Sequence, residues 1–144
     1  MSSDDLQYLL DRLAISDLLT TYAHAVDTRD WKLFRSVFTE DATIDYTNAG
    51  GIAGTVTDVA DWLGRTMEMF AATQHLVSNE MVTIDGDTAT VRALFYNPMR
   101  FANDGPFFHC GGWYNHELVR TDEGWRSRRL HEDHSWTQIE TAEE

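Results

Sequence analysis

The chain is 144 residues long, and its 42% hydrophobic content and two prolines favour a single globular domain over a disordered segment. Its 24 acidic and 11 basic residues give a net charge of −13, which repels phosphate backbones and anionic lipid headgroups, so neither nucleic acid nor a membrane is an expected partner. The acidic start lacks the basic flank and apolar run of a secretory signal, and the single cysteine excludes an internal disulfide, so we expect a cytoplasmic protein.

Apolar residues recur at helical spacing from Ser3 to about Val26. The apolar stripe shifts between Leu13 and Ile15. The pattern therefore predicts either one long helix whose buried face rotates or two helical pieces joined by a kink.

Asp27 stands at the start of a break, residues 27–30, between this pattern and a short second helix expected over residues 31–38. One interpretation makes Asp27 the N-cap of the second helix, with Asp30 in the acidic position of a capping box. The other makes it a carboxylate directed at a catalytic partner. The two roles are compatible.

The sequence pattern from residue 42 onward predicts one short hairpin, a third helix and a series of strands. Residues 42–48 alternate as a strand with a short partner at 52–56, and residues 57–70 carry a helical apolar face. Long extended runs follow at 74–84, 88–101, 107–120 and 125–136, joined by short connectors with turn residues. This order predicts an α+β fold in which three helices cover one face of a curved, mainly antiparallel sheet, followed by a solvated tail at 140–144.

His75 lies at the start of the strand predicted over residues 74–84. An imidazole titrates near neutral pH, so it can transfer protons inside an apolar pocket if a carboxylate fixes its tautomer. Asp27 is the candidate for that carboxylate, and Tyr22 and Tyr46 are candidate hydroxyl donors. The structural alternatives are a strand-end histidine bonded to backbone and two tyrosines that serve packing.

A metal site is the other chemistry to weigh, because His131, Glu132, Asp133 and His134 are consecutive. Residues three apart on a strand point to opposite faces, so the two histidines would not ligate one ion. Cys110 and the serines lack the pattern of an activated nucleophile. We therefore expect neither a metal nor another cofactor.

Three segments of the chain resemble a known family: residues 22–27 leading to Asp30-Trp31, Ile44-Asp45-Tyr46, and Thr73-Gln74-His75. In these segments the chain is similar to the SnoaL-like branch of the nuclear transport factor 2-like superfamily, which includes scytalone dehydratase, hexachlorocyclohexane dehydrochlorinase and a bile-acid dehydratase. The similarity runs from about Leu6 to Trp136. It implies a cone-shaped α+β fold whose helices close a deep apolar pocket against a bent sheet, commonly assembled as homodimers or homotrimers.

The resemblance also implies roles for individual residues. It places the acid/base dyad on Asp27 and His75, and a pocket tyrosine of the scytalone enzyme on Tyr46. Tyr22 matches a catalytic tyrosine of the bile-acid enzyme, and Arg120 approximately matches the catalytic arginine of the dehydrochlorinase.

We expect a further set of side chains to contact the substrate: Trp113, Tyr114, Phe70, Arg120 and His24. The chain departs from the scytalone enzyme at Val26, Gly112 and Tyr114, where that enzyme has a tyrosine, a serine and an asparagine. Scytalone itself is therefore not the expected substrate.

These expectations combine into a cofactor-independent lyase that acts on a small, largely apolar cyclic molecule. His75 would remove a proton next to a carbonyl or halogen-bearing carbon. Because an isomerase or a polyketide cyclase would use the same base, both stay open as alternatives. A ligand-binding or assembly subunit without catalysis also stays open, because one fold hosts many functions.

Overall fold

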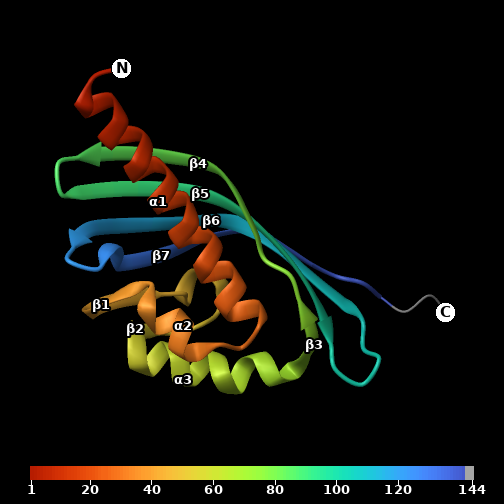
Figure 1. The fold of residues 1–144 in the computed structure, drawn as a ribbon. Coiled ribbons are helices and arrows are strands. Elements are labelled where there is room, and N and C mark those ends of the chain that lie inside the picture. The colour runs from red at the N-terminus through yellow and green to blue at the C-terminus, as the bar shows by residue number, and fades with distance from the viewer. Residues whose placement is uncertain (142–144) are drawn as a thin grey trace.

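Two layers make up the protein in the computed structural model, which describes residues 1–141. Helices α1 (Ser3–Asp27), α2 (Trp31–Ser36) and α3 (Val56–Thr66) cover one face of a curved, open sheet (Figure 1). This arrangement confirms the predicted three-helix α+β cone. Most of the predicted tail, residues 142–144, lies outside the described residues.

The sheet follows the order β2-β1-β7-β6-β5-β3, with β4 also paired to β5. Its strands in residues 1–141 are β1 (Phe38–Asp45), β2 (Ala53–Thr55), β3 (Phe70–Thr73), β4 (Leu76–Asp85), β5 (Thr88–Phe101), β6 (Phe107–Thr121) and β7 (Gly124–Ile139). The strand pairs are antiparallel except β1 and β7, which run parallel. The predicted antiparallel succession therefore holds from β4 to β7, and β1 joins the sheet beside β7.

Helix α1 is one continuous helix, which settles the alternative of a kink. It begins with a capping box in which Ser2 and Asp5 bond each other's backbone N–H groups. Its first turns expose their leucines, whereas the part from Ile15 onward is packed on the sheet. This packed part brings Tyr22 and Asp27 to the inner face. Within residues 1–141 no helix has the length and apolarity needed to cross a bilayer.

Helix α2 is capped by Asp30, whose Oδ1 accepts a hydrogen bond from the Leu33 N–H at 3.0 Å. The prediction that Asp27 caps this helix is wrong, because Asp27 is the last residue of α1. Two residues later Arg29 has φ +59°, a left-handed conformation that reverses the chain. The carboxylate of Asp27 is therefore free for another contact.

Strand β3 was absent from the sequence prediction, which extended the third helix to Phe70. The structure ends α3 at Thr66 and continues through a 3-10 turn, Met67–Met69, into β3. Both β3 and β4 pair with β5, and the chain breaks between them at residues 74–75. This break places His75 at the inner edge of the sheet, facing the end of α1.

Candidate active site

A cavity of about 260 Å³ lies between the helices and the inner face of the sheet. Its apolar lining includes Val26, Trp62, Leu63, Met67, Met69, Phe70, Met99, Phe101 and Phe108. Its polar lining includes Tyr22, Tyr46, His75, Asn97, Tyr114, Glu132 and His134. An apolar cavity with a few converging polar groups is typical of a site for a small organic molecule.

Asp27 and His75 meet at the edge of this cavity through two hydrogen bonds. His75 Nδ1 lies 2.6 Å from Asp27 Oδ1, and the His75 backbone N–H donates to Asp27 Oδ2 at 2.7 Å. Burial opposes the charge on Asp27, but the hydrogen bonds and charge of His75, aided by Thr73, outweigh burial and hold the pKa of Asp27 below its usual value. The carboxylate is therefore ionised at neutral pH and fixes both the backbone and the ring of His75.

Thr73 and Arg29 form a chain of hydrogen bonds that ends at the Asp27 carboxylate. Thr73 Oγ1 donates to Asp27 Oδ1 at 2.9 Å and accepts from Arg29 Nη1 at 2.9 Å. Arg29 also donates to the carbonyl oxygen of Val26 at 2.8 Å. The sequence prediction did not assign Arg29 a role, because it treated residues 27–30 only as a break between helices.

Asn97 contacts the other nitrogen of the imidazole. Its Nδ2 lies 2.8 Å from His75 Nε2 and donates to it when the ring carries its proton on Nδ1. The Asn97 side chain is buried, and its Oδ1 has no hydrogen-bond partner among the described residues. Since Asn97 lines the cavity and Asp27 does not, the Nε2 edge of His75 is the edge that the cavity reaches.

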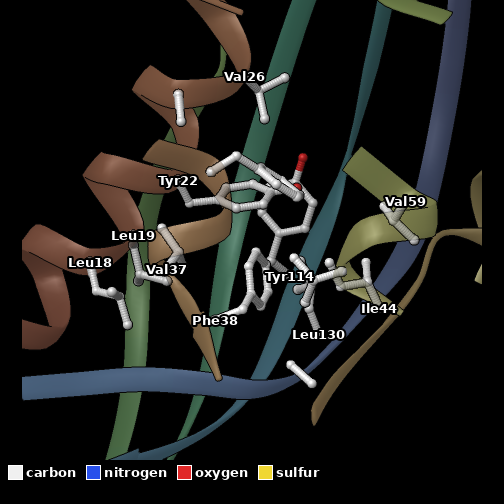
Figure 2. Packing of buried hydrophobic residues seen from close by; sticks show 14 of the residues in the cluster. Leu18, Leu19, Tyr22, Val26, Val37, Phe38, Ile44, Val59, Tyr114 and Leu130 are labelled. Carbon is white, nitrogen blue, oxygen red and sulfur yellow. The ribbon is translucent and has the colours of Figure 1, made fainter. Parts of the chain in front are cut away.

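Three buried tyrosines gather deeper in the cavity. The hydroxyls of Tyr22 and Tyr46 lie 2.5 Å apart. The ring of Tyr114 meets Tyr22 edge-on with centroids 5.2 Å apart, and the two side chains point toward one another from α1 and β6 (Figure 2). Burial raises the pKa of all three phenols well above its ordinary value, so they are neutral hydrogen-bond donors.

The consecutive acidic and histidine residues of β7 divide between the two faces of the sheet. His131 and Asp133 bond each other on the outer face at 3.0 Å, while Glu132 and His134 line the cavity. Within residues 1–141 no three His, Cys, Asp or Glu side chains are grouped to hold a metal. Sequence reasoning missed Glu132 as a cavity residue, although its spacing of two from the buried Leu130 would have placed it on the inner face.

Comparison with known proteins places this site in a family. Residues 7–131 match the SnoaL-like domain. The chain belongs to the SnoaL-like family. This confirms the resemblance seen in the sequence.

Among relatives of this SnoaL-like chain, the Mycobacterium tuberculosis protein Rv2910c is 43% identical over 117 residues, which are 81% of this chain and 80% of that protein. The structure of Kfla4162 from Kribbella flavida is 31% identical with a TM-score of 0.83, covering 91% of this chain and 95% of that one. A hexachlorocyclohexane dehydrochlorinase, LinA type 2, has a TM-score of 0.84 at 20% identity, covering 96% and 94% of the two chains. At that identity the last likeness shows a shared fold.

The SnoaL-like fold brings most of the predicted site residues together. Those that line the cavity are Tyr22, Tyr46, Phe70, His75 and Tyr114, and Asp27 lies directly behind His75. Their roles in catalysis or substrate binding stay predictions.

Trp113 and His24 lie elsewhere, which corrects their prediction as substrate contacts. Trp113 alternates with Tyr114 and points to the outer face, where the Arg92 guanidinium sits 4.6 Å from its ring centroid. His24 is exposed on α1, because it lies two residues after the buried Tyr22 and so faces away from the sheet.

Arg120 is also outside the cavity, which corrects its prediction as a substrate contact. It makes two hydrogen bonds to Asp11, at 2.6 and 2.9 Å, and one to Asp87 at 3.0 Å. These contacts join the first half of α1 to the far end of β6. Its geometry is that of a structural ion pair.

Arg120→Met is therefore expected to lower stability and to leave the cavity unchanged. Asp11 is buried, and the hydrogen bonds from Arg120 lower its pKa from 3.8 to about 2, so the variant leaves a buried carboxylate without its cation. Because Arg120 is partly exposed, we expect a loss of about 2 kcal/mol, below the full cost of breaking a buried pair.

The loss of stability in Arg120→Met should also depend on pH in a definite direction. A carboxyl with a depressed pKa stabilises the fold above its unfolded value of 3.8, and this contribution is lost as pH falls toward about 2. Urea unfolding should therefore show a smaller gap between wild type and Arg120→Met at pH 3 than at pH 7. Arg100→Met, which removes only a surface pair with Asp104, is the control, and equal losses in both variants would contradict the assignment.

Proposed function

We propose that this SnoaL-like protein is a cofactor-independent lyase, of dehydratase or dehydrohalogenase type, that acts on a small and largely apolar cyclic substrate. One observation carries the proposal: an imidazole oriented by a carboxylate lines an apolar cavity, with its Nε2 beside the Asn97 amide that also lines it. The fold is shared with a hexachlorocyclohexane dehydrochlorinase, and this likeness supports the proposal.

In this mechanism Asp27 holds the Nδ1 proton of His75, so the Nε2 lone pair is the proton acceptor. A substrate entering the cavity displaces the Asn97 amide from Nε2 and places its C–H bond there. After proton transfer, a half-turn of the Asn97 amide presents its Oδ1, which has no partner among residues 1–141, to the new Nε2–H. Asp27 stabilises the resulting imidazolium ion throughout.

The remaining groups act on the rest of the substrate. Tyr22 and Tyr46 are neutral donors that polarise an oxygen or assist a leaving group. The apolar walls exclude water, which strengthens each of these electrostatic contacts. A positioned base contributes about 10²- to 10⁴-fold, so positioning and the cavity supply the remainder of the acceleration.

The mass of the product tests this proposal. The protein is incubated with a panel of cyclic ketones that carry a hydroxyl or halogen beta to the carbonyl, and products are identified by mass spectrometry. Loss of water or halide supports the lyase. Conversion at unchanged mass would instead support an isomerase or cyclase that uses the same base, and binding without conversion would support a ligand-binding protein.

A further inference from the structure

Glu132 is a carboxyl group inside the cavity that the proposed base does not use. It lies on β7 opposite Tyr114 of β6, whereas His75 enters from the β4 side, so β5 and β6 separate the two groups. Glu132 is 8% exposed and lines the same cavity as His75. A ligand that fills the cavity can therefore contact both.

No group within residues 1–141 stabilises the ionised form of Glu132 by a hydrogen bond. Burial is the one cause that shifts its pKa, which rises to about 7. The phenols and the thiol of the cavity, Tyr22, Tyr46, Tyr114 and Cys110, have their pKa raised by burial, so all four are neutral near pH 7. The two histidines of the cavity are His75 and His134. A substantial fraction of Glu132 is then protonated at neutral pH, and this carboxyl group lines the cavity.

His134 is the basic residue on the same face of β7. Its Nε2 lies 2.6 Å from Thr137 Oγ1, and its backbone N–H donates to Asn48 Oδ1 at 2.6 Å. These bonds hold His134 at the rim of the cavity. Its ring contacts do not include the Glu132 carboxyl.

We propose that Glu132 is the general acid of this site and that the natural substrate carries a hydroxyl leaving group, so the reaction is a dehydration. This inference rests on the proposed lyase function with His75 as base. It goes further by choosing between the two leaving groups which that proposal leaves open.

The chemistry of the leaving groups decides the choice. A halide departs as a stable anion and needs no proton, so a dehydrohalogenase gains nothing from a second acid. A hydroxyl departs as hydroxide unless an acid protonates it during bond breaking, and a general acid with a pKa near the working pH does this best. The phenols and the thiol of the cavity hold their protons too tightly, since the pKa of Cys110 rises to about 12 and the phenols titrate well above 10. Glu132 is the carboxyl group that lines the cavity, and burial raises its pKa to about 7.

The step balances without another reactant. His75 Nε2 takes the proton from the carbon next to the carbonyl, and the electron pair of that C–H bond forms the C=C bond. The C–O bond breaks as Glu132 transfers its proton to the departing oxygen, which leaves as water. The proton on His75 then returns to Glu132 through solvent, which restores both groups.

Two probes that differ only in the leaving group test this assignment. 3-Hydroxycyclohexanone and 3-chlorocyclohexanone both yield cyclohex-2-enone, by loss of water and of HCl respectively. Glu132→Gln keeps the shape of the side chain but has no acidic proton. It is expected to slow loss of water by about 10²-fold or more and to change loss of HCl by less than about threefold. His75→Ala is expected to slow both, and Glu117→Gln, on the sheet outside the cavity, to slow neither.

The pH dependence of the two reaction rates is a second test of this assignment. Because the acid must be protonated, loss of water should fall as pH rises through about 7, while loss of HCl should not show this decline. Equal effects of Glu132→Gln on both probes, or its absence of effect on loss of water, would overturn the role of Glu132.

Infrared spectroscopy tests the acid without turnover. Difference spectra of the wild type between pH 5 and 8 should contain a protonated carboxyl band that disappears near pH 7, is absent in Glu132→Gln and shifts when cyclohexanol is added. A Glu132 that is already ionised at pH 5 would overturn the proposal even if His75 proves to be the base. Turnover of neither probe by the wild type would count against the lyase function, and the infrared result would then decide the state of Glu132 by itself.

Discussion

His75→Ala is expected to fold like the wild type and to lose turnover by about 10²- to 10⁴-fold, the usual contribution of a positioned base. The His75 side chain is 6% exposed, and its ring contacts are with Asp27 and Asn97 at the cavity edge. The variant therefore removes the ring nitrogens that bond these two residues at the cavity edge. Initial rates on a substrate found in the panel measure the loss, and circular dichroism verifies folding.

Two further variants make this result specific. Asp27→Asn keeps the size of the side chain but removes the charge that stabilises the imidazolium, so it should lose activity in the same direction. His109→Ala removes a histidine that stacks on Tyr96 with centroids 6.2 Å apart and does not line the cavity, and it should retain full activity. Wild-type rates in His75→Ala would reject the assignment of the base.

Gly112→Ala is expected to give the largest loss of stability in the sheet, about 3 kcal/mol, the upper end for overpacking. A methyl group at Gly112 would overlap the carbonyl oxygen of Asp133 and come within 3.1 Å of the Phe95 ring. The obstructing oxygen belongs to the β7 backbone at the irregularity between β6 and β7, so it yields only if the strand pairing shifts.

The neighbouring Gly111→Ala is the matched control. Its methyl would meet the indole of Trp136, which is 42% exposed near the end of β7 and is free to turn away. We expect this variant to lose about 1 kcal/mol or less. Urea unfolding of both variants measures the difference, and equal losses would show that the backbone of β7 adapts to the added methyl.

The sequence predicted the fold because helix and strand patterns are local, whereas the pairing of Asp27 with His75, 48 residues apart, came from the resemblance to the SnoaL-like family. The predicted helical pattern ends at about Val26, next to Asp27, and the predicted strand over residues 74–84 begins next to His75, so each residue stands near an element boundary. The sequence could not decide whether Asp30 or Asp27 caps α2, because either carboxylate suits the N-cap position.

The sequence did not show which face of each strand points into the cavity. Tyr114 and Trp113 are adjacent aromatic residues, and only the curvature and the irregular register of β6 and β7 decide that Tyr114 points into the cavity. Asn97 and Glu132 were missed because polar residues of a strand are usually assigned to solvent, although the spacing of Glu132 from the buried Leu130 places it on the inner face. Arg120 was misplaced because its assignment came from an approximate match to another enzyme, and its actual partner, Asp11, is 109 residues away in sequence.

Deuterium exchange into cyclohexanone tests the central claim most directly, because it reports proton abstraction without a leaving group. In D₂O the wild type is expected to accelerate exchange of the hydrogens next to the carbonyl, and His75→Ala and Asp27→Asn are expected to lose that acceleration. Exchange that is no faster with wild type than in buffer, or equally fast with His75→Ala, would contradict the role of the Asp27–His75 pair as a base.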